Sequence, residues 1–312
     1  MYKLKEKPED FVVKERIRLD LDSEGQYGYY LLVKKEKNTL DAVKEVARFF
    51  NVSFKDVGYA GNKDKVAITK QYISVKRGTE RNFKSKGLSW EFVGRGAKPI
   101  SLGDLEGNVF EIVVRGVEQK RKVNFIENYY DEQRFGENNR EIGKCFVKKD
   151  FKGACEILNL NLEDPLRSLS SLDKKMLSFY FHSYQSYLWD EIVARYIRER
   201  SKSSYSAPYE EGEFVFSEEK LKNIKVPLIS FNSKFKDKLL NKFKVEVLKE
   251  EGIEVSDFLI KEFPSLATLP QDRDLIVDVE WNRLEFFGDR AKLKFFLRKG
   301  SYATLVVKKM FA

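Results

Sequence analysis

The chain has 312 residues, long enough for two modest domains, either in series or one inserted in the other, and its 42% hydrophobic and 34% charged residues are typical of a folded protein rather than a disordered chain. Its 58 Lys and Arg residues exceed its 49 Asp and Glu residues, which favours nucleic acid as a partner, although Lys-rich and Glu-rich chains are also typical of proteins from hot environments. No apolar stretch is long enough to cross a membrane and the first fifteen residues are too charged for a signal peptide, so we expect a cytoplasmic protein with no membrane partner.

The first third of the chain shows mainly strand patterns. Alternating or β-branched and aromatic runs predict strands at residues 11–13, 27–33, 66–75, 88–93 and 108–114. One amphipathic helix is predicted at 39–50, with Thr39 as its N-cap and Leu40, Val43 and Phe50 on its apolar face. We therefore assign this region to the α+β class.

From about residue 137 the pattern changes to helices. Apolar residues at helical spacing predict helices at 139–158, 174–198 and 234–251, the last ending at Gly252, with a polar loop at 198–206. Strand patterns return at 274–279, 292–296 and 303–307. Because these last strands need a sheet to join, we predict one sheet domain built from residues 1–136 and 266–312, interrupted by a mainly helical insertion at 137–265.

The residue inventory excludes several kinds of catalytic site. His182 is the only histidine, and Cys145 and Cys155 lack C-x-x-C spacing, which argues against a Ser-His-Asp triad, a histidine metal site and a disulfide framework. No phosphate-binding glycine pattern follows a predicted strand. We therefore expect no metal and no cofactor, and an enzyme that works with carboxylates, amines and backbone groups.

A charged loop between the first helix and the strand at 66–75 reads Gly-Tyr-Ala-Gly-Asn-Lys-Asp-Lys at residues 58–65. Asp64 stands between Lys63 and Lys65, after Gly58 and Gly61, which allow a sharp turn. A solvated turn can have this charge pattern by chance. Alternatively, the pattern suits a site that needs an ionised acid close to a polyanion. The residues of the loop alone leave both interpretations open.

Residues 58–71 closely resemble the signature of the TruD family of pseudouridine synthases, G-[YF]-A-G-x-K-D-[KR]-x-A-x-T-x-Q, and every fixed position matches, ending at Gln71. Other segments resemble family motifs in the same order, namely Lys5 with Pro8-Glu9-Asp10-Phe11 and Glu15, Gly107-Asn108-Val109-Phe110, residues 128–136, and Gly300-Ser301-Tyr302-Ala303-Thr304. Tyr130 and Asp131 depart from the family's Phe and Gly. The resemblance spans nearly the whole chain and is weakest at about 199–250, where the insertion is shorter than usual.

The resemblance implies a pseudouridine synthase fold, in which a mixed, largely antiparallel sheet of the catalytic domain is interrupted by a helical TRUD domain. It also implies an isomerase that breaks the bond from sugar to nitrogen in a uridine of tRNA and rejoins the base at carbon 5, at position 13 of tRNA in this family. Such chemistry needs one carboxylate, as nucleophile or as base, without a metal. We expect tRNA as the partner, with other RNAs left open, and a monomeric protein.

The resemblance also implies roles for single residues. Asp64 corresponds to the catalytic carboxylate. Asn108 and Phe110 lie on the same face of one strand, where Asn108 would orient Asp64 or the base and Phe110 would stack on a flipped uracil. Lys5, Phe11 and Glu15 are expected around the base and the carboxylate. The candidates for RNA binding are Lys63, Lys65, Gln71, Gln133 and Arg134.

Each assignment has a structural alternative. Phe11 and Phe110 could be core residues, Glu15 could form a surface ion pair, and Lys63 could bind phosphate or offset repulsion between Asp64 and RNA. The rival functions are a catalytically inactive tRNA-binding protein or chaperone of the same fold, and a magnesium-dependent nuclease. Further RNA contact is expected from basic stretches, namely Lys76-Arg77, Arg81, Lys84, Lys86, Arg95, Lys98, Lys120-Arg121-Lys122 and Lys148-Lys149.

Overall fold

The computed structural model describes residues 2–118, 120–266 and 271–311, and the chain divides into two compact units. Of the described residues, the first unit contains 2–118, 120–124 and 278–303 with Phe311, and the second contains 125–266, 271–277 and 304–310. The sequence patterns placed the boundaries at 136/137 and 265/266. The boundaries of the units lie further out because the segments that flank the predicted insertion pair with each other, as strands β8 (Phe125–Glu127) and β13 (Ile276–Asp278).

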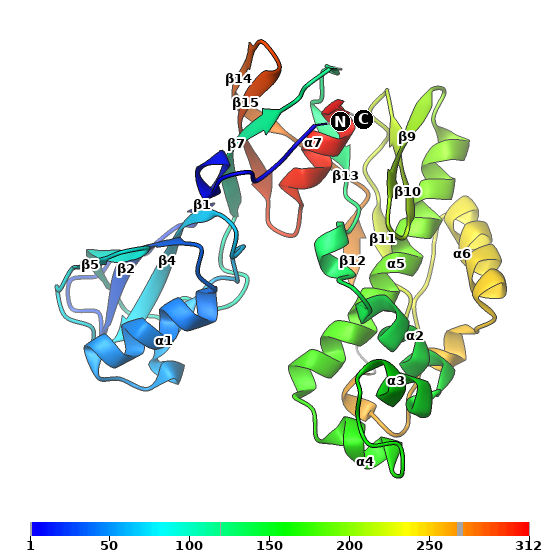
Figure 1. Ribbon diagram of the computed structural model, residues 1–312, viewed down its shortest axis with the longest axis horizontal. Helices are drawn as coiled ribbons and strands as arrows, with labels where there is room; N and C mark the ends of the chain where they lie inside the picture. Colours follow the sequence, from blue (N-terminus) through cyan, green and yellow to red (C-terminus); the bar gives the residue numbers. More distant parts are fainter. Residues whose placement is uncertain (1, 119, 267–270, 312) are drawn as a thin grey trace. The chain divides into compact units, whose positions relative to one another are not determined.

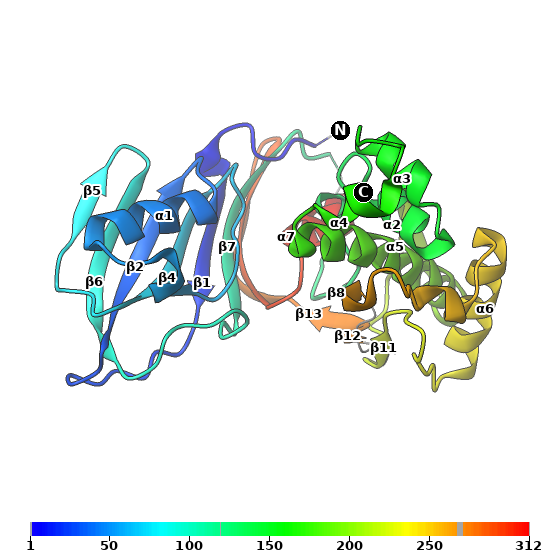
Figure 2. The ribbon, with the colours of Figure 1, turned by 90° about the horizontal axis from the view of Figure 1, so that it is seen from below.

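The first unit is built on one mixed sheet, which the described residues form with nine strands in the order β14-β15-β7-β1-β4-β2-β6-β5, with β3 also paired to β4 (Figure 2). The strands are β1 (Phe11–Arg16), β2 (Tyr27–Lys35), β3 (Val57–Tyr59), β4 (Ile68–Lys76), β5 (Phe83–Ser85), β6 (Leu88–Gly96), β7 (Gly107–Arg115), β14 (Glu280–Phe287) and β15 (Arg290–Arg298). β1 and β4 run parallel, and the other neighbouring pairs run antiparallel. The predicted α+β class with a mixed, largely antiparallel sheet is confirmed.

Helix α1 (Thr39–Phe50) covers part of one face of this sheet (Figure 2). Val43 and Val46 pack in a core with Tyr30, Leu32 and Ile73 of the strands beneath, because apolar residues at helical spacing meet the inward-facing residues of alternating strands. The predicted bounds of this helix are confirmed. Its N-cap, however, is Asn38 rather than Thr39.

The second unit is mainly helical. Its helices are α2 (Asn139–Lys148), α3 (Phe151–Ile157), α4 (Pro165–Ser170), α5 (Lys174–Arg200), α6 (Lys238–Glu251) and most of α7 (Ala303–Phe311). Its short strand pairs are β8 with β13, β9 (Ser204–Tyr209) with β10 (Gly212–Ser217), and β11 (Lys225–Pro227) with β12 (Asp272–Asp274). Both α2 and α6 pack against α5 (Figure 1). Residues around most of the circumference of α5 are therefore buried, Leu188, Trp189 and Ile192 among them. Short 3₁₀ helices lie at Pro8–Asp10, Phe54–Asp56, Glu132–Arg134, Val255–Phe258 and Pro264–Leu266.

Several predicted elements differ from the structure for local reasons. The predicted helix at 139–158 divides at Lys149, which has φ 58°, and Asp150 then caps α3 by accepting a hydrogen bond from the Gly153 N–H at 2.9 Å. The predicted helix at 234–251 begins only at Lys238, because the Asp237 carboxylate caps it there. The predicted loop at 198–206 was wrong from Ser204 onward, where β9 pairs with β10.

The predicted strand at 303–307 is also wrong, because these residues begin helix α7. Ala303, Val306, Val307 and Met310 are all buried and recur at helical spacing, which a five-residue window of β-branched residues conceals. Strand β14, which precedes β15 at the edge of the sheet, was not predicted.

Candidate functional site

The loop that carries Asp64 connects β3 to β4 in the first unit. A Cβ atom on Gly58 would lie 2.2 Å from the Ile100 carbonyl oxygen and 2.6 Å from the Ser74 hydroxyl oxygen, so glycine is required for this close packing. A Cβ atom on Gly61 would meet only the Lys63 ammonium, at 3.8 Å, which is an ordinary contact. Neither glycine has a positive φ, so the loop does not depend on them for a left-handed turn.

Lys5 contacts the carboxylate of Asp64 directly. Its Nζ donates a hydrogen bond to Asp64 Oδ2 at 2.8 Å, and the two side chains are 20% and 32% exposed. The same ammonium lies 4.4 Å from the centre of the Phe11 ring. Lys5 has φ 56°, a left-handed conformation that costs a non-glycine residue about 1 kcal/mol and persists where surrounding contacts enforce it.

The segment around Lys5 is tied to strand β7. Lys3 and Arg115 exchange two main-chain hydrogen bonds, at 2.8 and 3.1 Å. The buried Asp10 carboxylate accepts hydrogen bonds from Arg115 Nη2 at 2.7 Å and from the Lys7 N–H at 3.2 Å. The Pro8-Glu9-Asp10-Phe11 motif therefore anchors the segment on both sides of Lys5 and starts β1 at Phe11.

Next to Lys5, three aromatic rings lie in a row on one face of the sheet. Phe11 meets Phe110 edge to face with ring centres 6.1 Å apart, and Phe110 lies 5.7 Å from Phe295. Such pairs stabilise a core beyond their buried area. Phe110 is only 7% exposed in this structure. Asn108 lies opposite Glu15 on this face, and its buried Oδ1 makes no hydrogen bond to the described residues.

Glu15 and Lys63 form a buried ion pair below the loop. Lys63 Nζ lies 2.6 Å from Glu15 Oε2, and the side chains are 6% and 0% exposed respectively. The other carboxylate oxygen of Glu15 accepts a hydrogen bond from the Tyr72 N–H at 3.1 Å. Lys63 therefore neutralises Glu15, and the cation that contacts Asp64 is Lys5.

Polar side chains below the loop hold its backbone. The Thr39 hydroxyl accepts a hydrogen bond from the Lys63 N–H at 2.9 Å, and the buried Gln71 amide donates to the Gly61 carbonyl at 3.2 Å. Lys34 Nζ donates to the main-chain carbonyls of Lys63 at 3.2 Å and Asp64 at 2.7 Å. Sequence reasoning missed Lys34, although its place two residues after the inward-facing Leu32 on β2 is a signal of burial.

The structure therefore brings part of the predicted site together. Lys5, Phe11, Asp64 and Phe110 are linked by direct contacts, and Glu15, Lys63 and Gln71 lie beneath the loop. Lys65 is exposed beside them. Among the predicted basic stretches, Arg95 is engaged within the protein, where it donates to the carbonyls of Gly25 and Gly78 at 2.9 and 3.0 Å.

Gln133 and Arg134 belong to the second unit. Gln133 is exposed, and Arg134 donates to the Ser186 hydroxyl at 3.3 Å while it lies 5.1 Å from the Phe179 ring centre. Asp131, which replaces the glycine of the family motif, is held in place in this structure. Its carboxylate accepts a hydrogen bond from the Thr304 hydroxyl at 2.6 Å.

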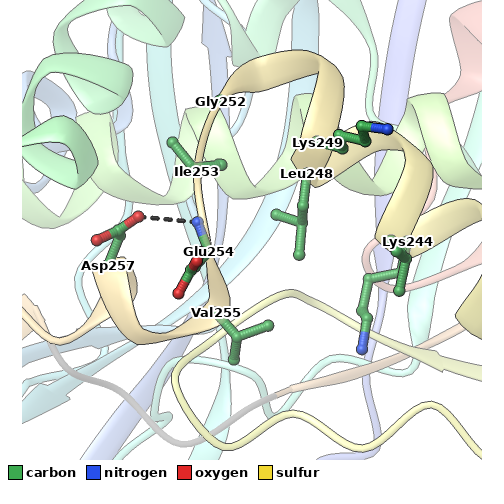
Figure 3. Close-up of a pocket in the computed structure, with 9 residues that line it drawn as sticks. Lys244, Leu248, Lys249, Gly252, Ile253, Glu254, Val255 and Asp257 are labelled. Atoms are coloured by element: carbon green, nitrogen blue, oxygen red, sulfur yellow. Dashed lines mark hydrogen bonds between the residues drawn. The ribbon is translucent and has the colours of Figure 1, made fainter.

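One hollow of about 740 Å³ lies in the second unit, along α6 and the turn after it (Figure 3). The carboxylate of Asp257 accepts a hydrogen bond from the Glu254 N–H there, at 2.8 Å. Its lining combines aliphatic side chains with Lys244 and Lys249, and none of the predicted site residues belongs to it. The hollow is therefore not the site that the motifs indicate.

Two kinds of site are absent from the described part of the chain. There, no group of three or more His, Cys, Asp and Glu side chains is arranged to hold a metal ion. None of the helices in these residues combines the length and apolar character needed to cross a membrane. Cys145 and Cys155 are both free thiols, and burial raises the pKa of Cys145 to about 11.

Comparisons with known proteins point to one family. The family described as tRNA pseudouridine synthase D (TruD) matches residues 2–164 and 211–310. A protein of Thermococcus sibiricus, described as a probable tRNA pseudouridine synthase D, is 30% identical over 99% of this chain and 94% of its own length. The tRNA pseudouridine synthase D of Aquifex aeolicus is 30% identical over 99% and 98% of the two chains.

A solved structure supports the fold. The crystal structure of the putative tRNA pseudouridine synthase D from Methanosarcina mazei matches with a TM-score of 0.69 and 23% identity, over 99% of this chain and 93% of that chain. The match to the family leaves out residues 165–210, which form α4, the whole of α5 and strand β9.

Proposed function

Because the chain belongs to the TruD family of tRNA pseudouridine synthases, we propose that it isomerises uridine to pseudouridine in tRNA, at position 13. The relatives are named as enzymes, which favours this activity over the inactive tRNA-binding protein. The proposal includes a monomeric enzyme without a cofactor, in which the first unit catalyses and the second is an inserted TRUD domain.

Asp64 is the catalytic carboxylate of this proposal. The observation that carries it is the Lys5–Asp64 contact of 2.8 Å, made by a partly exposed carboxylate in a loop whose backbone is held from below. A carboxylate can attack the sugar or remove a ribose proton, and both roles need the ionised form. The ammonium of Lys5 is complementary to that charge and offsets the repulsion between Asp64 and RNA phosphates.

Phe110 and Asn108 bind the flipped uracil in this account. The ring of Phe110 is almost fully covered, so stacking requires the side chains around it, such as Phe11, to shift when RNA binds. The buried Oδ1 of Asn108 lacks a hydrogen-bond donor among the described residues. This acceptor can receive a hydrogen bond from the imide N–H of uracil. The bond would be favourable because a buried acceptor without a donor is costly.

The remaining candidates divide by exposure. Glu15, Lys63 and Gln71 are buried and bonded to the protein, so we assign them to support of the loop rather than to contact with RNA. Lys65 is exposed and suited to a phosphate contact. Gln133 and Arg134 stay candidates for RNA contact made by the second unit.

Incubation with a tRNA transcript that has uridine at position 13 tests the function, with a transcript carrying cytidine there as the matched control. Sequencing of the modified RNA is expected to find pseudouridine at position 13 of the first transcript only, with the same yield in the presence of a chelator. Binding of both transcripts without isomerisation would establish the inactive binding protein instead. RNA cleavage that a chelator abolishes would establish the nuclease.

A further inference from the structure

Lys34 is a buried lysine that has no part in the substrate contacts proposed above. Its side chain is 0% exposed on the inward face of β2. No carboxylate of the described residues lies within ion-pair distance of its ammonium. Its hydrogen bonds instead go to two consecutive main-chain carbonyls, those of Lys63 and Asp64. A buried charge without a counter-ion is costly, so the arrangement needs a reason beyond packing.

We infer that Lys34 is a positioning residue for Asp64, whose ammonium holds these two carbonyls and so fixes the direction of the Asp64 side chain. The inference rests on the proposed function only in that Asp64 is catalytic there. A lysine can do this because its ammonium has three donors and no acceptor, so two adjacent carbonyls can share it. A charge-assisted bond to each carbonyl is about twice as strong as a neutral one.

The other anchors of the loop cannot replace Lys34. Thr39 binds the Lys63 N–H and Gln71 binds the Gly61 carbonyl, so both act before Asp64 in the chain. Lys5 contacts the carboxylate itself from a different segment. Among the described residues, Lys34 is the side chain bonded to the main chain of Asp64 itself. Loss of this bond frees the peptide that aims the carboxylate while leaving the sheet below intact.

The protonation state of Lys34 makes this role measurable. Burial lowers the pKa of Lys34 to about 8, opposed by the negative charge of Asp64 and reinforced by the positive charge of Lys63. The other charged groups at the loop are Glu15, paired with Lys63, Lys5, paired with Asp64, and the exposed Lys65. As pH rises through about 8, the bonds from Lys34 to the loop lose their charge assistance.

The first test needs only the wild-type protein and no activity. Nitrogen NMR of the lysine side chains measures the titration of Lys34, and hydrogen exchange measures the opening of the loop at residues 61–67. We expect the Lys34 ammonium to titrate over the same pH range in which hydrogen exchange of the loop amides becomes faster than the intrinsic pH dependence of exchange explains. Exchange of the amides in β2 and β4 should show no such acceleration. A loop whose corrected exchange is unchanged across that titration would overturn the inference.

The second test compares Lys34→Met with Lys35→Met, a neighbour whose partly exposed ammonium pairs with Glu9. Wild-type kcat is expected to fall as pH rises through about 8. Lys34→Met is expected to lower kcat roughly 10-fold to 100-fold with little change in KM, to speed loop exchange, and to lack this dependence on pH. Lys35→Met should behave as wild type. Equal kcat and loop exchange in both variants would contradict the inference.

These readouts separate the two proposals. If wild type is inactive on tRNA, the proposed function fails, and the wild-type titration and exchange still decide the role of Lys34. If Lys34→Met does not fold, the same wild-type measurement decides it.

Discussion

Lys5 and Asp64 are 59 residues apart in the chain, yet Lys5 Nζ lies 2.8 Å from Asp64 Oδ2. The lysine comes from a segment pinned to β7 through Arg115, and the aspartate comes from a loop held by Lys34, Thr39 and Gln71. Two independently anchored segments therefore meet at one ion pair. Pre-positioning of this kind is what a reaction with a single catalytic carboxylate requires.

Replacement of Lys5 by methionine removes the cation at Asp64 and keeps most of the side-chain volume. We expect kcat for uridine isomerisation to fall roughly 10-fold to 100-fold and tRNA affinity to change little, because one ammonium among many adds little to RNA binding. Lys3→Met is the control, since Lys3 is a highly exposed lysine of the same segment. Equal losses of kcat in both variants would show that general positive charge, rather than the Asp64 contact, matters.

The Lys63–Glu15 ion pair should contribute to stability only as a pair. Lys63→Met leaves the Glu15 carboxylate buried and unpaired, which typically costs about 3–5 kcal/mol of the free energy of unfolding. The double variant Lys63→Met with Glu15→Leu should be more stable than Lys63→Met in urea titrations. Lys65→Met, at an exposed position, should stay within about 0.5 kcal/mol of wild type. A double variant less stable than either single variant would contradict the paired account.

Phe110→Leu tests the stacking role of the aromatic ring. Leucine retains an apolar side chain between Phe11 and Phe295, so unfolding free energy should fall by about 1–2 kcal/mol. Phe295→Leu, in the same row of rings, should lose a similar amount of stability. Only Phe110→Leu is expected to lower kcat/KM, by roughly 10-fold or more, because base stacking contributes about 1–3 kcal/mol. Equal activity losses would assign Phe110 to the core alone.

Asp190 in α5 should make stability depend on pH. Burial raises its pKa well above the usual value, despite the hydrogen bond from the Tyr130 N–H at 2.9 Å. The native state therefore binds this proton more tightly than the unfolded state, and its contribution to stability falls as pH rises above about 4. Asp190→Asn keeps an acceptor for Tyr130 and should stabilise the protein at about pH 7, on the order of 1–3 kcal/mol.

Comparison of wild type and Asp190→Asn across a range of pH is the control for this prediction. Thermal unfolding of both proteins should show a stability difference that shrinks as pH falls to about 4 and below, where the wild-type carboxyl is neutral in the native state and becomes protonated in the unfolded state as well. An Asn variant that is less stable at every pH would mean that the ionised carboxylate is needed, for example by Arg273, which lies beside Tyr130.

The sequence named the candidate site residues because they are concentrated in short motifs, and the structure brings Lys5, Phe11, Asp64 and Phe110 into contact. Asn108 and Phe110 share a face through period-two geometry, but the roles expected for them and for Asp64 came from the resemblance of short motifs to the TruD family, because spacing alone left the core and solvated-turn interpretations open. Helix α1 was bounded correctly because Val43, Val46 and Ala47 recur at helical spacing and are buried, although Leu40, which was predicted on the same face, is exposed. In each case, local pattern and tertiary packing favour the same arrangement.

What could not be predicted depends on contacts between distant segments. Nothing in the spacing shows that Lys63 turns inward to Glu15 while Lys5 meets Asp64, because both lysines are compatible with the carboxylate. Lys34 was hidden because its partners are main-chain carbonyls, which leave no signature in residue type. Helix α7 was mistaken for a strand because Thr304, Val306 and Val307 have high strand propensity that packing overrides.

The most direct test of the account is a single-turnover measurement with Asp64→Asn, which keeps the shape of the side chain and removes its negative charge. The account predicts that pseudouridine formation falls at least about 1,000-fold while tRNA binding and the unfolding midpoint stay near wild type, whereas Asp56→Asn, in the turn before the same loop, retains full activity. Isomerisation by Asp64→Asn within about threefold of the wild-type rate would contradict the account, because the catalytic carboxylate would then lie elsewhere.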